Sequence, residues 1–387
     1  HRDLHLSLRR QRQMCIRDSY ISESSMVRCA TVAVFGLFII SVPLSAQEHN
    51  DSLVFSTSVV TEEMVSVAEA LLVTMGTEER RQRMLGIWKV DALQMSLEDE
   101  AREDWSYWPR PRSGLSIELM TTEQRKLTHD LLSTLLSSEG HLKVVHIMQL
   151  DEILWSLEDV GLPRGVEKYF LSFFGTPSRT TPWAWRFEGH HVSLSVTVSP
   201  GNISVTPSFF GADPSETQVG VLAGFRPLRD EEDIARDLVM SFNHSQRARA
   251  VISDEAPMDI LTAPANREPE VWSNWRSLIR PEGLLVREMN ETQQLLVRRL
   301  VNEVVTRYRP EISDAYLSAI NIEELSFAWM GGTERYAQHY YRLQGGDFVF
   351  EFDNAQDNGN HIHSVWRDIA NDYGNDLLAN HYRLSHR

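Results

Sequence analysis

Residues 339–366 read HYYRLQGGDFVFEFDNAQDNGNHIHSVW, a stretch in which apolar and polar side chains alternate. This alternation has the period of a half-buried β-strand, and Gly345-Gly346 within it is a strong signal for a two-residue turn. Residues 361–366 add a further strand after a polar loop. The stretch therefore predicts three antiparallel strands.

A turn at Gly345-Gly346 assigns each side chain of this hairpin to one of two faces. The apolar residues fall on the face that must pack in the core; they are Tyr341, Leu343, Phe348, Phe350 and Phe352. The other face carries Tyr340, Arg342, Glu351 and Asp353. The same turn predicts three cross-strand pairs, namely Gln344 with Asp347, Arg342 with Val349 and Tyr340 with Glu351.

The pattern around this hairpin occurs twice in the chain. Residues 112–127 share spaced Gly, Leu, Met and Gln residues with residues 281–296, at an offset of 169 positions. Residues 174–189 match residues 330–345 at an offset of 156 positions. Several matches in the same order indicate one structural unit used twice, which fits a chain of 387 residues.

Each unit predicts an amphipathic helix, a shorter helix, a hairpin and a third strand. We therefore expect an α+β fold with internally duplicated helix-plus-antiparallel-hairpin units, whose helices pack against one side of an antiparallel sheet. The expected first unit covers 47–255 and includes a connecting helix. A Pro-rich, acidic linker is expected at 256–270, and the second unit with a closing helix at 271–387.

The first 46 residues are expected to lie outside the fold. Residues 1–25 have the character of non-native read-through, because QRQMCIRDS resembles translated adapter sequence. Residues 26–46 have the layout of a secretory signal peptide, with an apolar run at 31–44 and small residues at the end. The run is shorter than the roughly 20 residues of a membrane span, so we expect cleavage, export to the periplasm or the medium, and no stable membrane insertion afterwards. An uncut anchor is the alternative.

Charge and cysteine content argue against several classes of protein. The chain has 38 Lys+Arg and 54 Asp+Glu, and residues 47–387 carry a net charge of −19. Such a chain lacks the basic face that neutralises phosphate, so no nucleic-acid partner is expected. The sequence has no P-loop and no GxGxxG, GxSxG or HExxH signature, so no nucleotide or flavin is expected. Both cysteines precede residue 47, which leaves histidine and carboxylate as metal ligands.

The placement of histidines is the positive chemical signal. His361 and His363 alternate with an apolar residue, so both project from one face of a strand. If the preceding loop folds this strand back beside the hairpin, the two imidazoles join Glu351 or Asp353. Two imidazoles and a carboxylate on one face form a site suited to a divalent transition metal such as Zn, Fe, Mn or Cu.

The first unit adds two histidines at its own hairpin turn. With Gly189-His190 as the turn, Glu188 faces His191. The matching positions of the second unit hold no histidine. If the two sheets join across the pseudo-symmetry, these side chains can face the histidines of the second unit, and His190 and His191 become candidate ligands. His339, at the far end of the second hairpin, is a further candidate.

Three functional hypotheses follow from these residues. The first is an exported metal-dependent enzyme, hydrolytic or oxidative, that acts on a small molecule, peptide or glycan, with Arg342 orienting an anionic group of the substrate. The second is a metal-free hydrolase with Glu188, Glu351 or Asp353 as acid and base and a histidine as helper. The third is a non-catalytic periplasmic protein that binds a peptide or glycan. A solvated polar sheet face without such a function is the alternative to all three.

The chain also resembles a known family from about residue 60 to 384. The resemblance lies in WRFEGHHVSLSVTV at 185–198, SVTPSFFGADP at 204–214, GFRPLRDEEDIARDL at 224–238 and RARAVISDEAPMDI at 247–260. It is most specific in the string HYYRLQGGDFVFEFDNAQDNGNHIHSVWRDIANDYGNDLL. These strings are similar to the domain-of-unknown-function 3500 family. The resemblance implies an exported or standalone domain of the size of an enzyme, and it supplies no mechanism.

Overall fold

The computed structural model describes residues 46–76, 83–85, 88–90, 93–157, 164–263 and 280–385. The expected read-through at 1–25, and residues 26–45 of the expected signal peptide, lie outside this part of the chain. From Ala46 onward the chain forms one compact unit. Within the described residues, no helix combines the length and the apolar character needed to cross a membrane.

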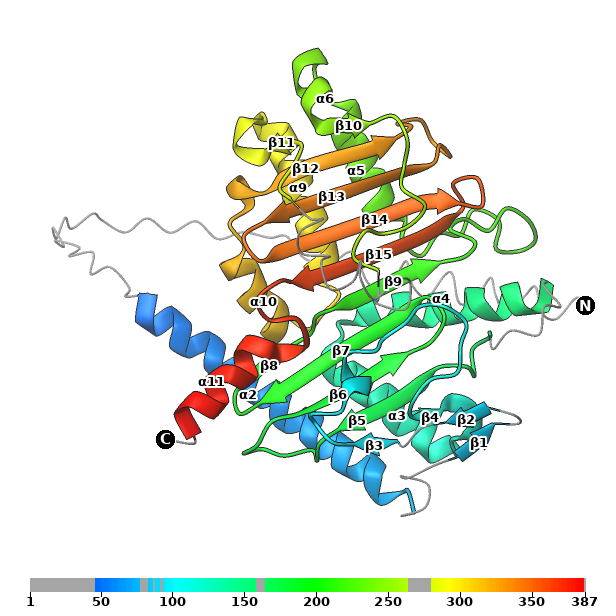
Figure 1. Ribbon diagram of the computed structural model, residues 1–387, viewed down its shortest axis with the longest axis vertical. Helices are drawn as coiled ribbons and strands as arrows, with labels where there is room; N and C mark the ends of the chain where they lie inside the picture. Colours follow the sequence, from blue (N-terminus) through cyan, green and yellow to red (C-terminus); the bar gives the residue numbers. More distant parts are fainter. Residues whose placement is uncertain are drawn as a thin grey trace, which may run out of the picture. The chain divides into compact units, whose positions relative to one another are not determined.

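One mostly antiparallel sheet of 13 strands runs through this unit (Figure 1). Its path is β10-β12-β13-β14-β15-β9-β7-β6-β5-β3, with β11 beside β12, β4 beside β5 and β8 beside β7. The first half supplies β3 (Gln94–Met95), β4 (Leu115–Ser116), β5 (Phe170–Phe174), β6 (Trp183–Glu188), β7 (Val192–Ser199), β8 (Asn202–Ser204) and β9 (Ser208–Ala212). The second half supplies β10 (Val251–Ser253), β11 (Leu284–Leu285), β12 (Ser326–Gly331), β13 (His339–Gly345), β14 (Phe348–Gln356) and β15 (His361–Asp368). A separate antiparallel pair joins β1 (Arg83–Leu85) and β2 (Trp88–Val90).

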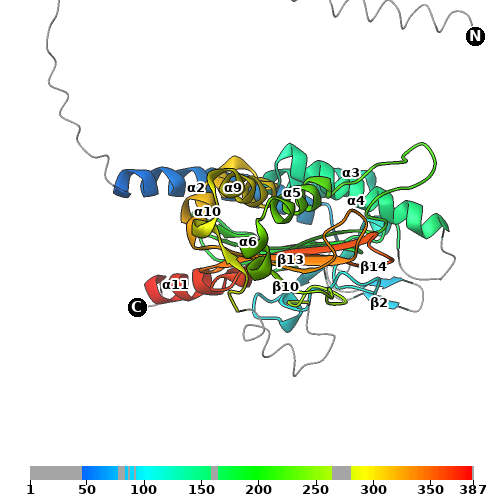
Figure 2. The same cartoon turned by 90° about the horizontal axis from the view of Figure 1, so that it is seen from above.

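The long helices of both halves pack on one face of the sheet, as Figure 2 shows. They are α2 (Ala46–Val73), α3 (Thr122–Leu135), α4 (Ser138–Leu157), α5 (Arg229–Met240), α9 (Glu291–Val305) and α10 (Pro310–Ala319). The main core lies between them and the sheet, where Trp185, Phe350 and Trp366 are buried. The remaining helical elements are α6 (His244–Ala250), α11 (Asn375–Ser385), and the short turns η1 (Glu100–Arg102), η2 (Ile117–Leu119), η4 (Val286–Glu288), η5 (Ile322–Glu324) and η6 (Asp372–Gly374). The expected α+β class is confirmed.

The strand pairing of the first half recurs in the second. The strands β5, β6, β7 and β9 pair in antiparallel succession, with β4 antiparallel and β3 parallel to β5. The strands β12, β13, β14 and β15 do the same, with β11 antiparallel and β10 parallel to β12. The helices α3 and α9 both begin with a capping box, from Thr121 with Gln124 and from Asn290 with Gln293. The last strands of the two halves, β9 and β15, pair antiparallel and join the halves into one sheet.

The hairpin β13–β14 turns one residue later than expected. Gly345 pairs with Phe348, so the turn residues are Gly346 and Asp347, and the positive φ of 55° falls on Gly346. The three expected cross-strand pairs were therefore wrong; the observed pairs are Gln344 with Val349, Arg342 with Glu351 and Tyr340 with Asp353. The pairing moved by two positions, which preserves alternation, so the expected assignment of side chains to the two faces is confirmed.

The hairpin β6–β7 departs from expectation in the same way. The Gly189 N–H donates to the Val192 carbonyl (2.8 Å), so the turn residues are His190 and His191 rather than Gly189 and His190. Glu188 consequently pairs with Ser193 and not with His191. His191 takes a positive φ of 66°, the conformation that lets the chain reverse within two residues.

Two loops cover the sheet face opposite the helices. Strap 1, residues 96–113, crosses the first half, and strap 2, residues 254–263, crosses the second. Both straps pack on Phe209 and Val365, which project from the central strands into a second, smaller core. The polar side chains on this face of the sheet are therefore buried beneath the straps, where an uncovered antiparallel sheet would have left them in water.

The connection between the halves differs from the expected linker. The helix α5 packs on α9 and the strand β10 pairs with β12, so both elements belong structurally with the second half. Residues 256–263 of the expected linker lie in strap 2, and residues 264–270 lie outside the described residues. The Glu351 carboxylate holds the strap on the sheet by accepting hydrogen bonds from the backbone N–H groups of Leu261 (2.8 Å) and Thr262 (3.0 Å).

Candidate metal centre

Three imidazoles meet at one end of the central strand pair β9–β15. His361 and His363 stand at the start of β15, and His191 is the second turn residue between β6 and β7. One ring nitrogen of each lies within 4.8 Å of the others, and the Nε2 atoms of His191 and His361 are 2.8 Å apart. All three side chains are buried. These residues, called the His cluster below, form a group that can hold a metal ion.

Gly211 allows the turn and the strand to come this close. It pairs with His363, and its backbone N–H donates to the His191 carbonyl (2.7 Å). A Cβ atom at this position would lie 2.7 Å from a ring carbon of His191 and 2.7 Å from the Ile362 carbonyl oxygen. Contacts that short do not occur, so only glycine permits the observed approach.

Carboxylates orient two of the three imidazoles. His361 Nδ1 lies 2.8 Å from an Asp357 oxygen, and His363 Nδ1 lies 2.8 Å from an Asp259 oxygen. A carboxylate at Nδ1 keeps the ring proton there and leaves the lone pair on Nε2, which is the usual arrangement of histidines that bind metals. The Nε2 atoms of His361 and His363 are therefore the ligand atoms that these two rings offer.

Both straps contribute to the position of Asp259. The Tyr107 hydroxyl of strap 1 donates to Asp259 Oδ2 (3.0 Å), and the Tyr107 ring lies against His363 with the ring centroids 4.5 Å apart. Gln356 Nε2 is a longer donor to the same oxygen, at 3.4 Å. Residues from both halves of the chain thus surround a single imidazole.

Burial favours the neutral form of His191 and His361, which is the form that binds metals. It holds the pKa of His191 well below the ordinary value of 6.5, and the neighbouring imidazoles lower that pKa further. Burial and the nearby His363 also lower the pKa of His361, while Asp213 and Asp357 oppose that shift. The lone pairs are consequently available at neutral pH.

The dimensions of the cluster fit a small divalent metal. Nitrogen ligands about 2.0–2.1 Å from a tetrahedral Zn²⁺ are about 3.3 Å from one another. The two closest nitrogens of the cluster, on His191 and His361, are 2.8 Å apart, a distance that also suits an N–H···N hydrogen bond between neutral rings. Coordination would require this pair to separate by about 0.5 Å and the His363 nitrogen, which lies within 4.8 Å of both, to take its place beside them, movements that side-chain rotation can supply.

Two of the expected ligands lie outside the His cluster. His190 turns towards α4, where its Nδ1 lies 2.5 Å from an Asp151 oxygen, although its ring lies against that of His191. His339 lies on the opposite face of the sheet, near α5; its Nδ1 donates to the Ala337 carbonyl (2.8 Å) and its ring stacks on a tryptophan. Strand alternation explains this placement, because His339 lies an even number of residues from Tyr341 and Leu343, whose side chains face the core.

Arg342 and Glu351 are buried on the polar face of the sheet and hold structural contacts there. Glu351 accepts hydrogen bonds from the Tyr340 hydroxyl (2.6 Å) in addition to those from strap 2. Arg342 Nη2 donates to the Arg280 carbonyl (2.9 Å) and lies 3.5 Å from a Glu282 oxygen. The polar face that the sequence predicts exists, but its charges are satisfied inside the protein.

The other two expected carboxylates are also engaged. Glu188 lies 3.2 Å from Arg186 Nη2 and accepts the backbone N–H of Ser106 (3.1 Å). Asp353 lies opposite His363 in the sheet, and one of its oxygens accepts a backbone N–H. Among the described residues, the groups of three or more potential ligands contain none of Glu188, Glu351 and Asp353.

Four residues of the site were not expected, namely Tyr107, Asp213, Asp259 and Asp357. The polar loop before His361 was a usable signal for Asp357, because it directly precedes the histidine pair. Asp259 lies in the stretch interpreted as a linker, and no local pattern connects it with β15. A second group of potential ligands consists of Asp213, Asp357 and the same His361.

Comparison with known proteins identifies a family. No curated protein and no solved structure matches the chain. A sequence model described as protein of unknown function (DUF3500) matches residues 57–375, a span that contains the whole His cluster and both straps. The resemblance seen in the sequence is thus confirmed, and the chain belongs to the DUF3500 family.

Proposed function

We propose that this protein is a metal-dependent enzyme whose divalent transition metal is held by His191, His361 and His363. The observation that carries the proposal is the convergence of three buried imidazoles from two separate hairpins, two of them oriented by carboxylates. Burying three imidazoles together stabilises the fold little, and placing a carboxylate behind the ring is typical of metal ligands.

The ligand set favours hydrolysis. Three neutral imidazoles leave a divalent metal its full charge and, in tetrahedral geometry, one open position, as in catalytic zinc sites. Such a metal supplies Lewis acidity and a water of lowered pKa, whereas Fe, Mn or Cu in the same place would supply oxidative chemistry. Asp259 and Asp357 hold the rings in orientation, and the straps keep bulk water from the cluster.

The substrate is proposed to approach from the side of His361. This imidazole is 9% exposed, compared with 2% for His191 and 3% for His363. The open side borders the β14–β15 turn that carries Asp357. An opening of this kind admits a small molecule, or the end of a peptide or glycan, more readily than a large folded substrate.

Elemental analysis of untagged protein tests the proposal. We expect about one Zn, Fe, Mn or Cu per chain in the parent and loss of that metal in His361→Ala. His244→Ala is the matched control, because His244 is exposed on α6 and lies outside the cluster. A parent without metal after growth and dialysis with each of these ions, or a His361→Ala variant that keeps its metal, would overturn the proposal.

The metal-free hydrolase has less support. Glu351 already accepts hydrogen bonds from strap 2 and Tyr340, and Glu188 is paired with Arg186, so neither is free to exchange protons with a substrate. Activity in crude or purified fractions that survives a strong chelator would favour this alternative, and activity lost with the metal would favour the proposal.

We also propose that the protein is exported. The support is the layout of residues 26–46, which matches a signal peptide. The amino-terminal sequence of the protein recovered from the periplasm or medium is expected to begin just after Ala46. Recovery in the cytoplasm with residues 26–46 intact would contradict this proposal and leave the metal centre untouched.

A further inference from the structure

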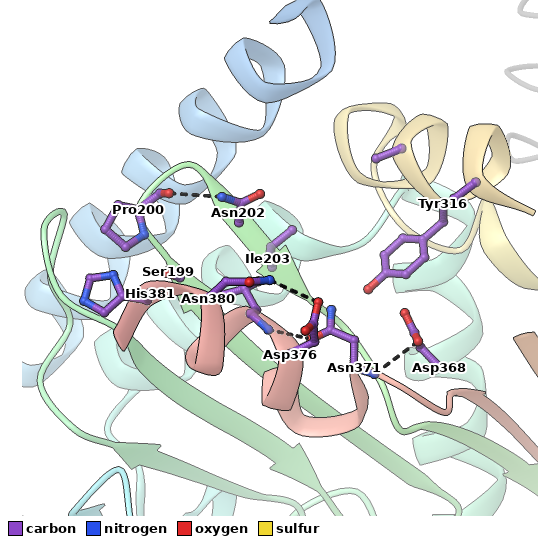
Figure 3. Close-up of a pocket in the computed structure, with 13 residues that line it drawn as sticks. Ser199, Pro200, Asn202, Ile203, Tyr316, Asp368, Asn371, Asp376, Asn380 and His381 are labelled. Carbon is purple, nitrogen blue, oxygen red and sulfur yellow. Dashed lines mark hydrogen bonds between the residues drawn. The ribbon is translucent and has the colours of Figure 1, made fainter. Parts of the chain in front are cut away.

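A polar cavity opens at the other end of the central strand pair, between α10, α11 and the end of β15 (Figure 3). Its volume is about 440 Å³, and an adjoining cavity of about 290 Å³ shares Tyr316, Ala319 and Asp368 with it. The two cavities together are called the Asp368 groove below. His361 and Asp368 are the two ends of β15, which places this groove about 23 Å from the His cluster.

The lining of the groove is mostly acidic, and His381 is the one basic side chain among the described residues that line it. Asp368 and Asp376 line the larger cavity, and Asp347 and Glu324 line the smaller one. None of the described residues that line either cavity is a lysine or an arginine. Within the described residues, neither Asp347 nor Asp368 forms an ion pair. The charges of Asp347 and Asp368 are therefore not compensated by a cation, unlike the buried charges beneath the straps.

Asp368 carries the most consequential of these charges. Its carboxylate accepts the backbone N–H of Asn371 (3.2 Å). Burial raises the pKa of Asp368 to about 6, and the carboxylates of Asp372 and Asp347 also raise it. The nearest buried cation, Arg367, is already paired with Asp372 at 2.7 Å. A ligand that brings positive charge would therefore stabilise the ionised form of Asp368.

Tyr316 supplies an aromatic wall beside this carboxylate. Its ring packs edge-on against Trp366 with the centroids 4.8 Å apart, which fixes its orientation. Figure 3 shows the Tyr316 hydroxyl and the Asp368 carboxylate pointing into the same space. An ammonium group in that space would interact with both the carboxylate and the Tyr316 hydroxyl oxygen, and alkyl carbons would lie against apolar residues such as Ile203 and Ala319.

We propose that the Asp368 groove binds an aliphatic diamine in its dicationic form. One ammonium group pairs with Asp368 beside Tyr316, and the other lies at Asp376 on α11. The geometry favours this class over a sugar because the side-chain amides nearby are already engaged: Asn380 donates to Asp376 (3.1 Å), Asn202 donates to the Pro200 carbonyl (3.3 Å), and Asn371 accepts the Leu377 N–H (3.2 Å). The proposal is independent of the metal centre.

Isothermal titration of the whole protein with 1,4-diaminobutane tests the proposal. At about pH 7.5 both the ligand amines and Asp368 are charged, and we expect saturable binding that the uncharged diol of the same length, 1,4-butanediol, does not show. Asp368→Asn is expected to weaken binding at least about tenfold, because one charge-assisted contact is lost. Asp314→Asn is the control, because Asp314 is exposed on α10, the helix that carries Tyr316, and lies outside the groove.

The pH dependence gives a second readout. At about pH 5 only a tenth of a carboxyl group with a pKa of about 6 is ionised, so the affinity is expected to fall about tenfold between pH 7.5 and pH 5. The ligand remains charged across this range. The ionisable groups around Asp368 come from every neighbouring element; they are Tyr316, Glu324, Asp347, Arg367, Asp372, Asp376 and His381. The series is repeated in His381→Asn to separate the imidazole from Asp368.

Three results would overturn the proposal. The first is the absence of saturable binding up to about 10 mM diamine, which corresponds to less than about 3 kcal/mol. The second is equal binding of 1,4-butanediol, or of a methyl glycoside, which would make the groove a site for neutral ligands. The third is an unchanged affinity in Asp368→Asn with an unchanged melting temperature.

Discussion

The two ends of the central strand pair β9–β15 share a backbone hydrogen bond between a hairpin turn and the neighbouring strand, and they have opposite chemistry. At one end the turn His190-His191 lies beside the end of β9, where the Gly211 N–H donates to the His191 carbonyl (2.7 Å). At the other end the turn Gly346-Asp347 lies beside the end of β15, where the Ile369 N–H donates to the Asp347 carbonyl (2.8 Å). Imidazoles gather at the first end, and carboxylates gather at the second.

This difference shows how a duplicated fold can hold two unlike sites. Backbone pairing depends on alternation and on short turns, which the two halves share. The chemistry depends on a few side chains at the turn and on the neighbouring strand, which the halves do not share. The covering also differs: straps 1 and 2 bury the histidine end, whereas the Asp368 groove stays open between helices.

The largest effect is expected from exchanging the turns. The double change His190→Gly and His191→Asp gives β6–β7 the turn that closes β13–β14. We expect the fold to persist and the metal affinity to fall by more than about 100-fold, beyond the 10–100-fold typical of outer-shell changes. Elemental analysis and a thermal melt measure the two outcomes. His190→Gly alone is the control for the lost contact with Asp151, and full metal content in the double variant would exclude His191 as a ligand.

A smaller effect on the same end is expected from Asp259→Asn. The amide keeps the size of the side chain but loses the charge that orients His363, so metal affinity should fall about 10–100-fold. Competition with a chromogenic chelator measures the affinity. Asp254→Asn, an exposed change in the same strap, should leave it unaltered. If both variants bind metal equally, Asp259 has no part in positioning the ligand.

A pair of glycine substitutions compares the backbone of the two ends. Gly211→Ala forces a Cβ atom against His191 and Ile362, and we expect a loss of about 1–3 kcal/mol in the free energy of unfolding together with weaker metal binding. In Gly346→Ala the new Cβ atom meets nothing within 4 Å, so only the positive φ of this residue is unfavourable. We expect a loss of about 1 kcal/mol in the free energy of unfolding and unchanged metal binding. Urea denaturation measures both. Equal effects on metal binding would show that the approach at Gly211 is unimportant.

The smallest effect concerns stability at the acidic end. The pKa of Asp368 is about 6 in the folded protein, compared with 3.8 for an ordinary aspartate. Ionisation of this group therefore opposes folding, and the free energy of unfolding falls as the pH rises from about 4 to 6. Asp368→Asn should therefore be slightly more stable than the parent near pH 7.5 and equal to it near pH 4, with solvent screening keeping the difference small. Urea denaturation at both values, with Asp314→Asn alongside, measures the change. A variant that is less stable than the parent at pH 7.5 would contradict the raised pKa of Asp368.

Alternation along single strands was sufficient to predict much of the candidate site. It correctly placed His361 and His363 on one face, and Arg342 and Glu351 on the same side as each other. Turn position was predicted less well, because a glycine pair allows a two-residue turn at either of two adjacent positions. This error did not change the predicted faces, because moving the strand pairing by two positions leaves every side chain on the same side of the sheet.

The straps could not be predicted from local patterns. Residues 256–263 have the composition of a linker, yet Thr262 and Asp259 are buried on the sheet because Glu351 and Tyr107 bind them. Such contacts join residues about 90 to 150 positions apart, and no periodicity in the sequence records them. The same reasoning explains why Glu351 was expected as a catalytic group and is found holding a loop.

The amino-acid sequence alone was enough for the α+β class, for the two faces of the hairpin β13–β14 and for excluding cysteine as a metal ligand after residue 46, because these follow from composition and from a period of two. The tertiary structure decided which histidines meet. The pairing of β9 with β15 brings His191 to His361 across 170 positions, and the close approach at Gly211 completes the contact. Long-range pairing of this kind is selected by the burial of two whole sheet faces rather than by any local signal, so only the folded chain reveals it.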